Sequence, residues 1–220
     1  MTLEFLLLLL ESGLLIATVV MLIYSIHEGK RRDHLLREVG RVTKVLTRQE
    51  YFFSIMEAMA DAKREIIGCI TGTPPSSDDI RMTRHIADAI ERLTKKGVIV
   101  RYLLPKFPDR LQIGLRYTKA GAEISFSSCL MVHNLRYIVV DEETVVFGMP
   151  ERTGDKEATK KGYTIPSEGL AALLKNDFSD CKDKTSLKDY LQEVLKQTGA
   201  TLEHLAREFH LDPGDLNAVV

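Results

Sequence analysis

The feature that most constrains the fold of this sequence is a regular alternation of helical and strand patterns through its central part. In the helical stretches apolar residues recur at i, i+3, i+4 and i+7, as in Phe52, Ile55, Met56 and Met59, and the stretches between them are short apolar runs. Helices are expected at residues 50–64, 79–96, 111–120 and 169–181, and strands at residues 65–71, 98–104, 122–127, 130–140 and 144–148. This order predicts an α/β domain over residues 49–185, with a mixed, mostly parallel sheet flanked by helices.

A hydrophobic segment at residues 5–26 is long enough to cross a bilayer, which requires about 20 apolar residues in a helix. Its only charged side chain is Glu11. A cleaved signal peptide is disfavoured, because no basic residue precedes the segment and no small-residue cleavage site follows it. Lys30, Arg31 and Arg32 follow the segment, so the positive-inside rule places the rest of the chain in the cytoplasm. We therefore expect residues 1–26 to be a signal-anchor helix of a single-pass membrane protein, and the basic residues could also contact anionic lipid headgroups.

Residues 27–48 are expected to form a basic helical connector. Leu35, Val39, Val42 and Leu46 recur at spacings of four, three and four, which is an apolar stripe on one side of a helix. The stripe covers too few heptads to distinguish pairing with a second copy of the chain from packing on the following domain.

Residues 132–153 read VHNLRYIVVDEETVVFGMPERT. This segment resembles the signature of the phospholipase D superfamily, H-x-K-x4-D-x6-G-S-x-N-x-S/T, with Asp141 and Gly148 matching its aspartate and glycine. The other motif positions hold Asn134 for the nucleophilic histidine, Arg136 for the lysine, Met149 for the serine, Glu151 for the asparagine and Thr153 for the hydroxyl residue. The helices and strands around the motif extend the resemblance over residues 50–183.

The resemblance implies a phosphodiesterase fold whose catalytic members use a histidine nucleophile and a second histidine from a second motif copy. This chain carries one degenerate copy, so a complete site would require a homodimer. Asn134 can neither attack phosphorus nor transfer a proton at neutral pH, so we expect a catalytically inactive, membrane-tethered module that binds a protein partner or senses an anionic, phosphate-containing ligand. Its expected ligand-binding residues are Asn134, Arg136, Glu151 and Thr153, and no metal or cofactor is expected. Asp141 and Gly148 are expected to have structural roles.

His133 supports an alternative function. It precedes the expected histidine position by one residue, so on a regular strand it would point away from Arg136. A β-bulge at Asn134 and Leu135 would return it to the same face. The chain would then be an active nuclease or phospholipase that uses His133 and Asp141 in a homodimer.

The C-terminal residues 186–220 are expected to form a small helical element. The stretch 202–211 resembles the first half of a helix-turn-helix, but the following helix would be short and without basic side chains. The formal net charge of −1 also argues against a nucleic-acid partner, so a packing or protein-interaction role is preferred.

Residues 154–161 are polar and predict a mobile loop. Cys69, Cys129 and Cys181 lie far apart in the sequence and predict free thiols in a reducing compartment.

Overall fold

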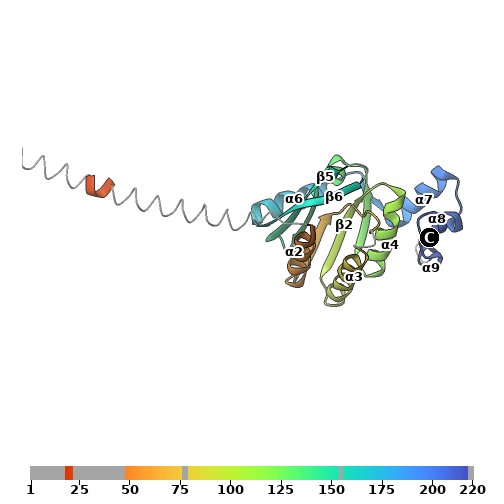
Figure 1. Ribbon diagram of the computed structural model, residues 1–220, viewed down its shortest axis with the longest axis horizontal. Coiled ribbons are helices and arrows are strands. Elements are labelled where there is room, and N and C mark those ends of the chain that lie inside the picture. Colours follow the sequence, from red (N-terminus) through yellow and green to blue (C-terminus); the bar gives the residue numbers. More distant parts are fainter. Residues whose placement is uncertain (1–17, 22–47, 76–78, 154–155, 218–220) are drawn as a thin grey trace, which may run out of the picture. The chain divides into compact units, whose positions relative to one another are not determined.

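The computed structural model describes residues 18–21, 48–75, 79–153 and 156–217 (Figure 1). The contacts divide the chain into two units, Met1–Thr43 and Lys44–Val220. Residues 18–21 are helical, whereas the rest of the predicted membrane segment and nearly all of the connector lie outside the described residues. Within the described ranges, no helix has the length and apolar character needed to cross a bilayer.

The second unit contains one mixed sheet whose described strands number seven. The strands are β1 (Glu65–Cys69), β2 (Ile99–Pro105), β3 (Glu123–Ser127), β4 (Arg136–Val140), β5 (Thr144–Thr153), β6 (Lys156–Pro166) and β7 (Thr185–Ser186). The helices are α2 (Arg48–Ala60), α3 (Ile80–Lys95), η1 (Pro108–Arg110), α4 (Leu111–Lys119), α5 (Leu130–Asn134), α6 (Glu168–Asp180), α7 (Leu187–Thr198), α8 (Leu202–Glu208) and α9 (Pro213–Asn217). The predicted α/β fold with helices flanking a mixed sheet is therefore confirmed.

The predicted predominance of parallel strands is wrong. The strand order is β6-β5-β4-β1-β2-β3-β7, and only the β1–β2 and β2–β3 pairs among these are parallel. The other four neighbouring pairs are antiparallel. For β4–β5 and β5–β6 the reason is that the connections are too short for a crossover helix. Asp141 and Glu142 lie in the first of these connections, with φ angles of 53° and 64°.

Two predicted segments differ from the structure. Residues 130–134 form helix α5 and not the first part of a strand, so β4 begins only at Arg136. The β1–β4 ladder ends at the pair Cys69–Tyr137 and the β4–β5 ladder ends at the pair Gly148–Arg136, so residues 130–134 lie beyond both ladders. The predicted loop at 154–161 is also wrong in most of its length, because β6 begins at Lys156 and pairs with β5 along a long hairpin.

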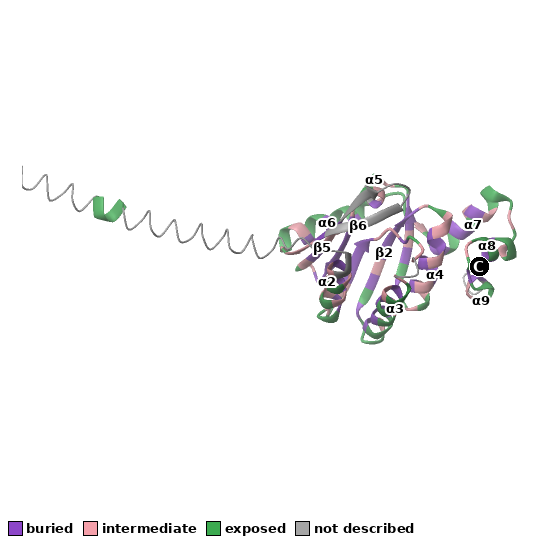
Figure 2. Ribbon diagram, viewed as in Figure 1, coloured by how far each residue is buried: buried purple, intermediate pink, exposed green. Residues whose placement is uncertain are grey.

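Each face of the sheet is covered by a separate hydrophobic core. Helices α2, α3 and α4 cover one face, and α5 and α6 cover the other (Figure 1). All five residues of β4 are buried, as expected for a strand between two layers, and purple colouring follows the central strands in Figure 2.

The C-terminal helices α7, α8 and α9 extend the core on the α4 side. Leu191, Leu205 and Leu216 belong to that core and are fully buried, and the ring of Tyr190 stacks on Phe126 with a centroid distance of 4.4 Å. Lys119 of α4 also forms a salt bridge of 2.8 Å with Asp215 of α9. These contacts give the tail a packing role.

Candidate functional site

The motif segment begins at the edge of the sheet where the parallel strands β1, β2 and β3 end. Strand β4 runs antiparallel to β1, and Tyr137 lies opposite Cys69, so Arg136 enters the sheet at that edge. Contacts between α5 and β2 hold the preceding helix against the same edge. We call this region the carboxyl edge, and in open α/β sheets such an edge is the usual place for a ligand.

Asn134 and Arg136 are not neighbours on one face of a strand. Asn134 is the exposed last residue of α5, whereas Arg136 is buried in the first position of β4. Arg136 shares the strand face of Ile138 and Val140, which belong to the core beneath α2. Burial raises the pKa of Tyr51 on α2, and the nearby positive charge of Arg136 acts in the opposite direction.

The strand pairing beside Arg136 includes two glycines. Arg136 lies opposite Gly148, and Gly148 lies opposite Gly162 on β6. A Cβ atom on Gly162 would lie 2.4 Å from Cδ2 of Tyr51, so the aromatic ring occupies the space above that glycine. Gly162, the cross-strand partner of Gly148, thus leaves room for the Tyr51 ring.

Glu151 and Thr153 lie on the part of β5 that extends beyond Gly148. Glu151 pairs with Ala158 and Thr153 pairs with Lys156, after a register shift between Met149 and Pro150. The backbone places both residues on the β5–β6 hairpin, past the end of the β4–β5 ladder.

His133 does not occupy the position that a bulged strand would give it. Residues 130–134 are helical, so the bulge at Asn134 and Leu135 that the alternative function requires is absent from this described segment. The half-buried ring of His133 packs edge-on against Phe107, with a centroid distance of 5.2 Å and an interplanar angle of 78°.

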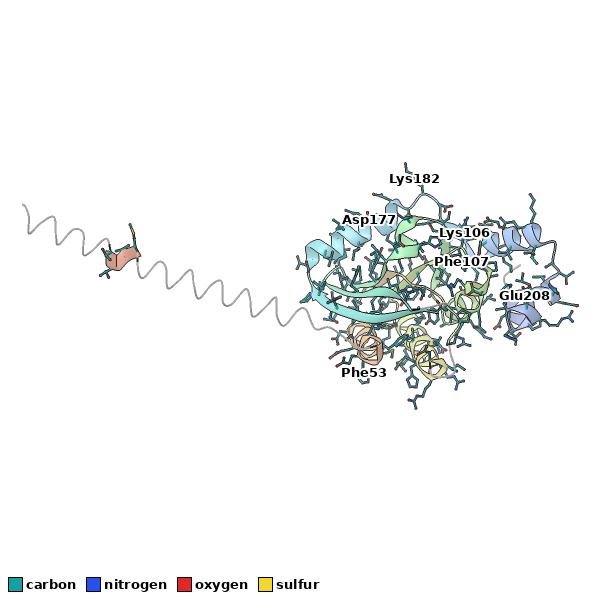
Figure 3. All side chains as sticks on the ribbon, turned by 45° about the horizontal axis from the view of Figure 1, so that its top comes forward. Phe53, Lys106, Phe107, Asp177, Lys182 and Glu208 are labelled. Atoms are coloured by element: carbon teal, nitrogen blue, oxygen red, sulfur yellow. The ribbon has the colours of Figure 1, made fainter. Side chains whose placement is uncertain are left out.

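Phe107 and its neighbours are candidate site residues that the sequence analysis missed. The Phe107 side chain is 44% exposed, and the guanidinium of Arg110 lies 5.5 Å from its ring centroid. Lys106 precedes Phe107, and both are labelled in Figure 3. Lys106 forms ion pairs with Asp183 at 3.6 Å and Glu193 at 3.2 Å. The available signal was the position of Lys106 and Phe107 directly after a strand predicted to be buried, between Pro105 and Pro108.

Asp141 lies at the other end of β4, which we call the amino edge because β1 begins there. Its carboxylate accepts hydrogen bonds from the backbone N–H groups of Lys63, Arg64 and Glu65 at 2.7, 2.8 and 2.9 Å. Burial opposes ionisation of this carboxyl, but the three hydrogen bonds and the charge of Arg64 outweigh it and lower the pKa of Asp141. The carboxylate thereby fixes the start of β1 next to the β4–β5 turn.

A chain of ion pairs surrounds Asp141 at the amino edge. Glu65 accepts hydrogen bonds from Lys175 of α6 and from Arg101 of β2, and Lys175 also donates to Glu142. Burial raises the pKa of Glu65, but these two cations outweigh burial and lower it. Hydrogen bonds to Glu142 and Glu65 raise the pKa of Lys175.

Among the residues that the structure describes, no group of histidine, cysteine or carboxylate side chains is arranged to hold a metal ion.

Comparisons with known proteins give fold relatives only. No protein-family model and no curated protein matches this chain. NucT from Helicobacter pylori matches with a TM-score of 0.50 and 10% identity, over 66% of this chain and 98% of NucT. Nuc from Salmonella typhimurium, a phospholipase D family member, matches with a TM-score of 0.46 and 17% identity, over 61% of this chain and 88% of Nuc.

The archaeal chromatin protein TrmBL2, described with a novel mode of DNA binding, matches with a TM-score of 0.45 and 20% identity. That match covers 72% of this chain, which spans only 64% of TrmBL2. The NucT match shows a shared fold and, at this identity, nothing about activity. The chain thus has a mixed α/β fold similar to that of NucT.

Proposed function

We propose that this chain is a membrane-tethered, non-catalytic phospholipase D-like module that binds an anionic, phosphate-containing ligand at its carboxyl edge. The observation that carries the proposal is the position of Asn134. It takes the place of the nucleophilic histidine in the aligned motif and lies exposed at that edge, where its amide can donate and accept hydrogen bonds but cannot form a phosphohistidine.

Arg136 is the residue that we assign to the anion. A guanidinium has five donors in a fixed fork, so it can serve a phosphate group in addition to its contacts within the protein. The exposed ring of Phe107 and the exposed amide of Asn134 belong to the same edge. Residues 1–26 would hold the domain at the cytoplasmic side of the membrane, and a homodimer or a protein partner would complete the site.

His133 is the residue on which the alternative activity depends. Its ring is half-buried against Phe107 on a helix, and this packing favours a structural role over that of a nucleophile. The phosphodiesterase alternative, either nuclease or phospholipase, is therefore the hypothesis that the experiment must eliminate.

The test is an assay of the compact unit Lys44–Val220 on a chromogenic phosphodiester, on single-stranded DNA and on phospholipid vesicles. The parent, His133→Ala and the restoring change Asn134→His are assayed side by side. We expect no turnover in the parent or in His133→Ala. Turnover by the parent that disappears in His133→Ala would overturn the proposal and establish an active phosphodiesterase.

Ligand binding is tested separately with inorganic phosphate as the probe. We expect phosphate to raise the thermal midpoint of the parent, because a ligand that binds only the folded state stabilises it. Arg136→Gln should lose this increase, whereas Arg116→Gln, a matched change on α4, should retain it. An equal increase in both variants would exclude Arg136 as the anion site.

A further inference from the structure

The three cysteines, far apart in the sequence, meet in one core. Cys69 ends strand β1, Cys129 precedes helix α5, and Cys181 caps the end of helix α6. All three pack in the core beneath α6, where Cys69 is buried and the other two are half-buried. Small oxidants can therefore reach Cys129 and Cys181 more readily than Cys69.

Ser127 connects the two half-buried cysteines. Its hydroxyl oxygen accepts the backbone N–H of Cys129 at 2.9 Å and lies 3.2 Å from the sulfur of Cys181. Because the oxygen accepts from the amide, its own proton is available to the Cys181 sulfur. The Ser127 hydroxyl thus contacts both cysteine residues, and its O–H can donate a hydrogen bond to the Cys181 thiolate when that forms.

The strand register aligns the two segments that carry these cysteines. Strands β3 and β7 are antiparallel, with Phe126 opposite Thr185. Beyond the strands, Ser128 donates its backbone N–H to the side-chain carboxylate of Asp183 at 2.7 Å, which joins the segment before Cys129 to the segment after Cys181. Together with the contact of Ser127 with the Cys181 sulfur, this bond holds residues 127–129 against residues 181–183. A disulfide requires this kind of proximity, with Cα atoms about 4.4–6.8 Å apart.

Cys69 provides a contrast within the same core. Burial raises its pKa to about 12, and the neighbouring Cys181 and Cys129 act in the same direction. The thiolate is the nucleophilic form of cysteine, so Cys69 is expected to be inert.

We propose that Cys129 and Cys181 are a redox-reactive pair that forms a reversible intrachain disulfide with a hydroperoxide as oxidant, and that this bond restrains helix α5. The carbonyl of Cys129 accepts the backbone N–H groups of Val132 and His133, so a bond at Cys129 anchors the first turn of the helix that carries Asn134. Disulfides in reducing compartments are usually transient and sensory, in agreement with this role. The proposal does not depend on the proposed ligand.

The chemistry uses two thiols and one hydroperoxide. The Cys181 thiolate attacks the peroxide oxygen, the O–O bond breaks, and the products are a sulfenic acid at Cys181 and water (or an alcohol). The Cys129 thiolate then attacks that sulfur, the S–S bond forms, and the S–O bond breaks with release of water. The two thiols lose two electrons and two protons, and the peroxide is reduced. A dithiol reductant reverses the reaction by thiol exchange.

The test treats the reduced full chain with graded hydrogen peroxide, alkylates the remaining thiols and maps the peptides by mass spectrometry without reduction. We expect a peptide pair joined through Cys129 and Cys181, with Cys69 alkylated. Cys69→Ala should form the same link, and Ser127→Ala should form it about two- to tenfold more slowly, as expected for loss of one hydrogen bond. Cys129→Ser should instead accumulate a dimedone-reactive sulfenic acid at Cys181.

A second measurement addresses the helix. Amide hydrogen exchange of Val132 and His133 should slow when the disulfide forms and recover on reduction. A disulfide through Cys69, a disulfide only between chains, or overoxidation without any disulfide would contradict the proposed Cys129–Cys181 pair. A Cys129–Cys181 disulfide that leaves amide exchange in α5 unchanged would contradict the proposed restraint of that helix.

Discussion

The two ends of strand β4 are built in opposite ways. At the amino edge, Asp141 accepts three backbone hydrogen bonds, and Glu65 and Lys175 continue the polar contacts into β2 and α6. At the carboxyl edge, Phe107 and Leu130 are 44% and 76% exposed, and a short helix replaces the expected strand. The ends are separated by only five residues, roughly 17 Å at the rise of an extended strand.

This difference separates two roles within one motif. Asp141 fixes the sheet, and its partners are backbone N–H groups that any residues except proline at positions 63–65 would supply. Asn134 has no structural task of that kind, because it is exposed at the end of its helix. We therefore expect the fold to depend on the amino edge more than on the carboxyl edge.

The largest expected effect is that of Asp141→Ala. The change leaves three backbone donors without their acceptor, and we expect it to lower the free energy of unfolding by about 3 kcal/mol. Urea denaturation of residues 44–220 measures this loss, and Asp141→Asn, which retains one acceptor oxygen, should lose less. If Asp141→Ala lowers the free energy of unfolding by no more than an ordinary surface substitution does, the amino edge does not stabilise the sheet.

Lowering the pH should reproduce part of the decrease in the free energy of unfolding that Asp141→Ala causes. The folded-state pKa values of Asp141 and Glu65 are lowered, so the unfolded chain binds more protons than the folded chain as the pH falls through the ordinary carboxyl range. Stability from these groups is present above their unfolded pKa and lost as the pH falls through their folded pKa. Urea midpoints between pH 7 and pH 3 should decrease, and Asp141→Asn should show a shallower decrease than the parent.

Lys175→Met should have a smaller effect. Lys175 lies between Glu65 and Glu142, and its removal leaves Glu65 with Arg101 as its remaining cation, so we expect a loss of about 1 kcal/mol. The matched control is Lys95→Met, which removes an exposed i,i+4 pair with Glu91 and should leave the urea midpoint unchanged. Equal midpoints for the two variants would mean that the amino-edge network is no stronger than an isolated surface pair.

The smallest effect is expected at the carboxyl edge. Asn134→Ala removes an exposed side chain and should change the free energy of unfolding by less than about 0.5 kcal/mol. The same urea titration measures it. A loss comparable to that of Asp141→Ala would contradict the division of roles between the two edges.

Several parts of this structure could be predicted from the sequence. Apolar periodicity located the core helices and the strands β1, β2 and β3, because burial of one helix face or of both strand faces leaves a local pattern. The motif spacing drew attention to Asp141, for which a structural role was predicted, and to Arg136, for which ligand binding remains a prediction. The membrane anchor, the ligand and the homodimer remain predictions.

The sequence by itself determined which segments are helices and strands in most of the domain and which residues enter its cores, since these follow from local periodicity. Only the tertiary structure decided that the stretch 130–134 is a helix, which lies beyond the ends of the β1–β4 and β4–β5 ladders. Only the tertiary structure paired 156–166 with β5, and only it gathered Cys69, Cys129 and Cys181 in one core. Strand pairing and the meeting of distant residues depend on which backbone edges become neighbours, and that information is not local.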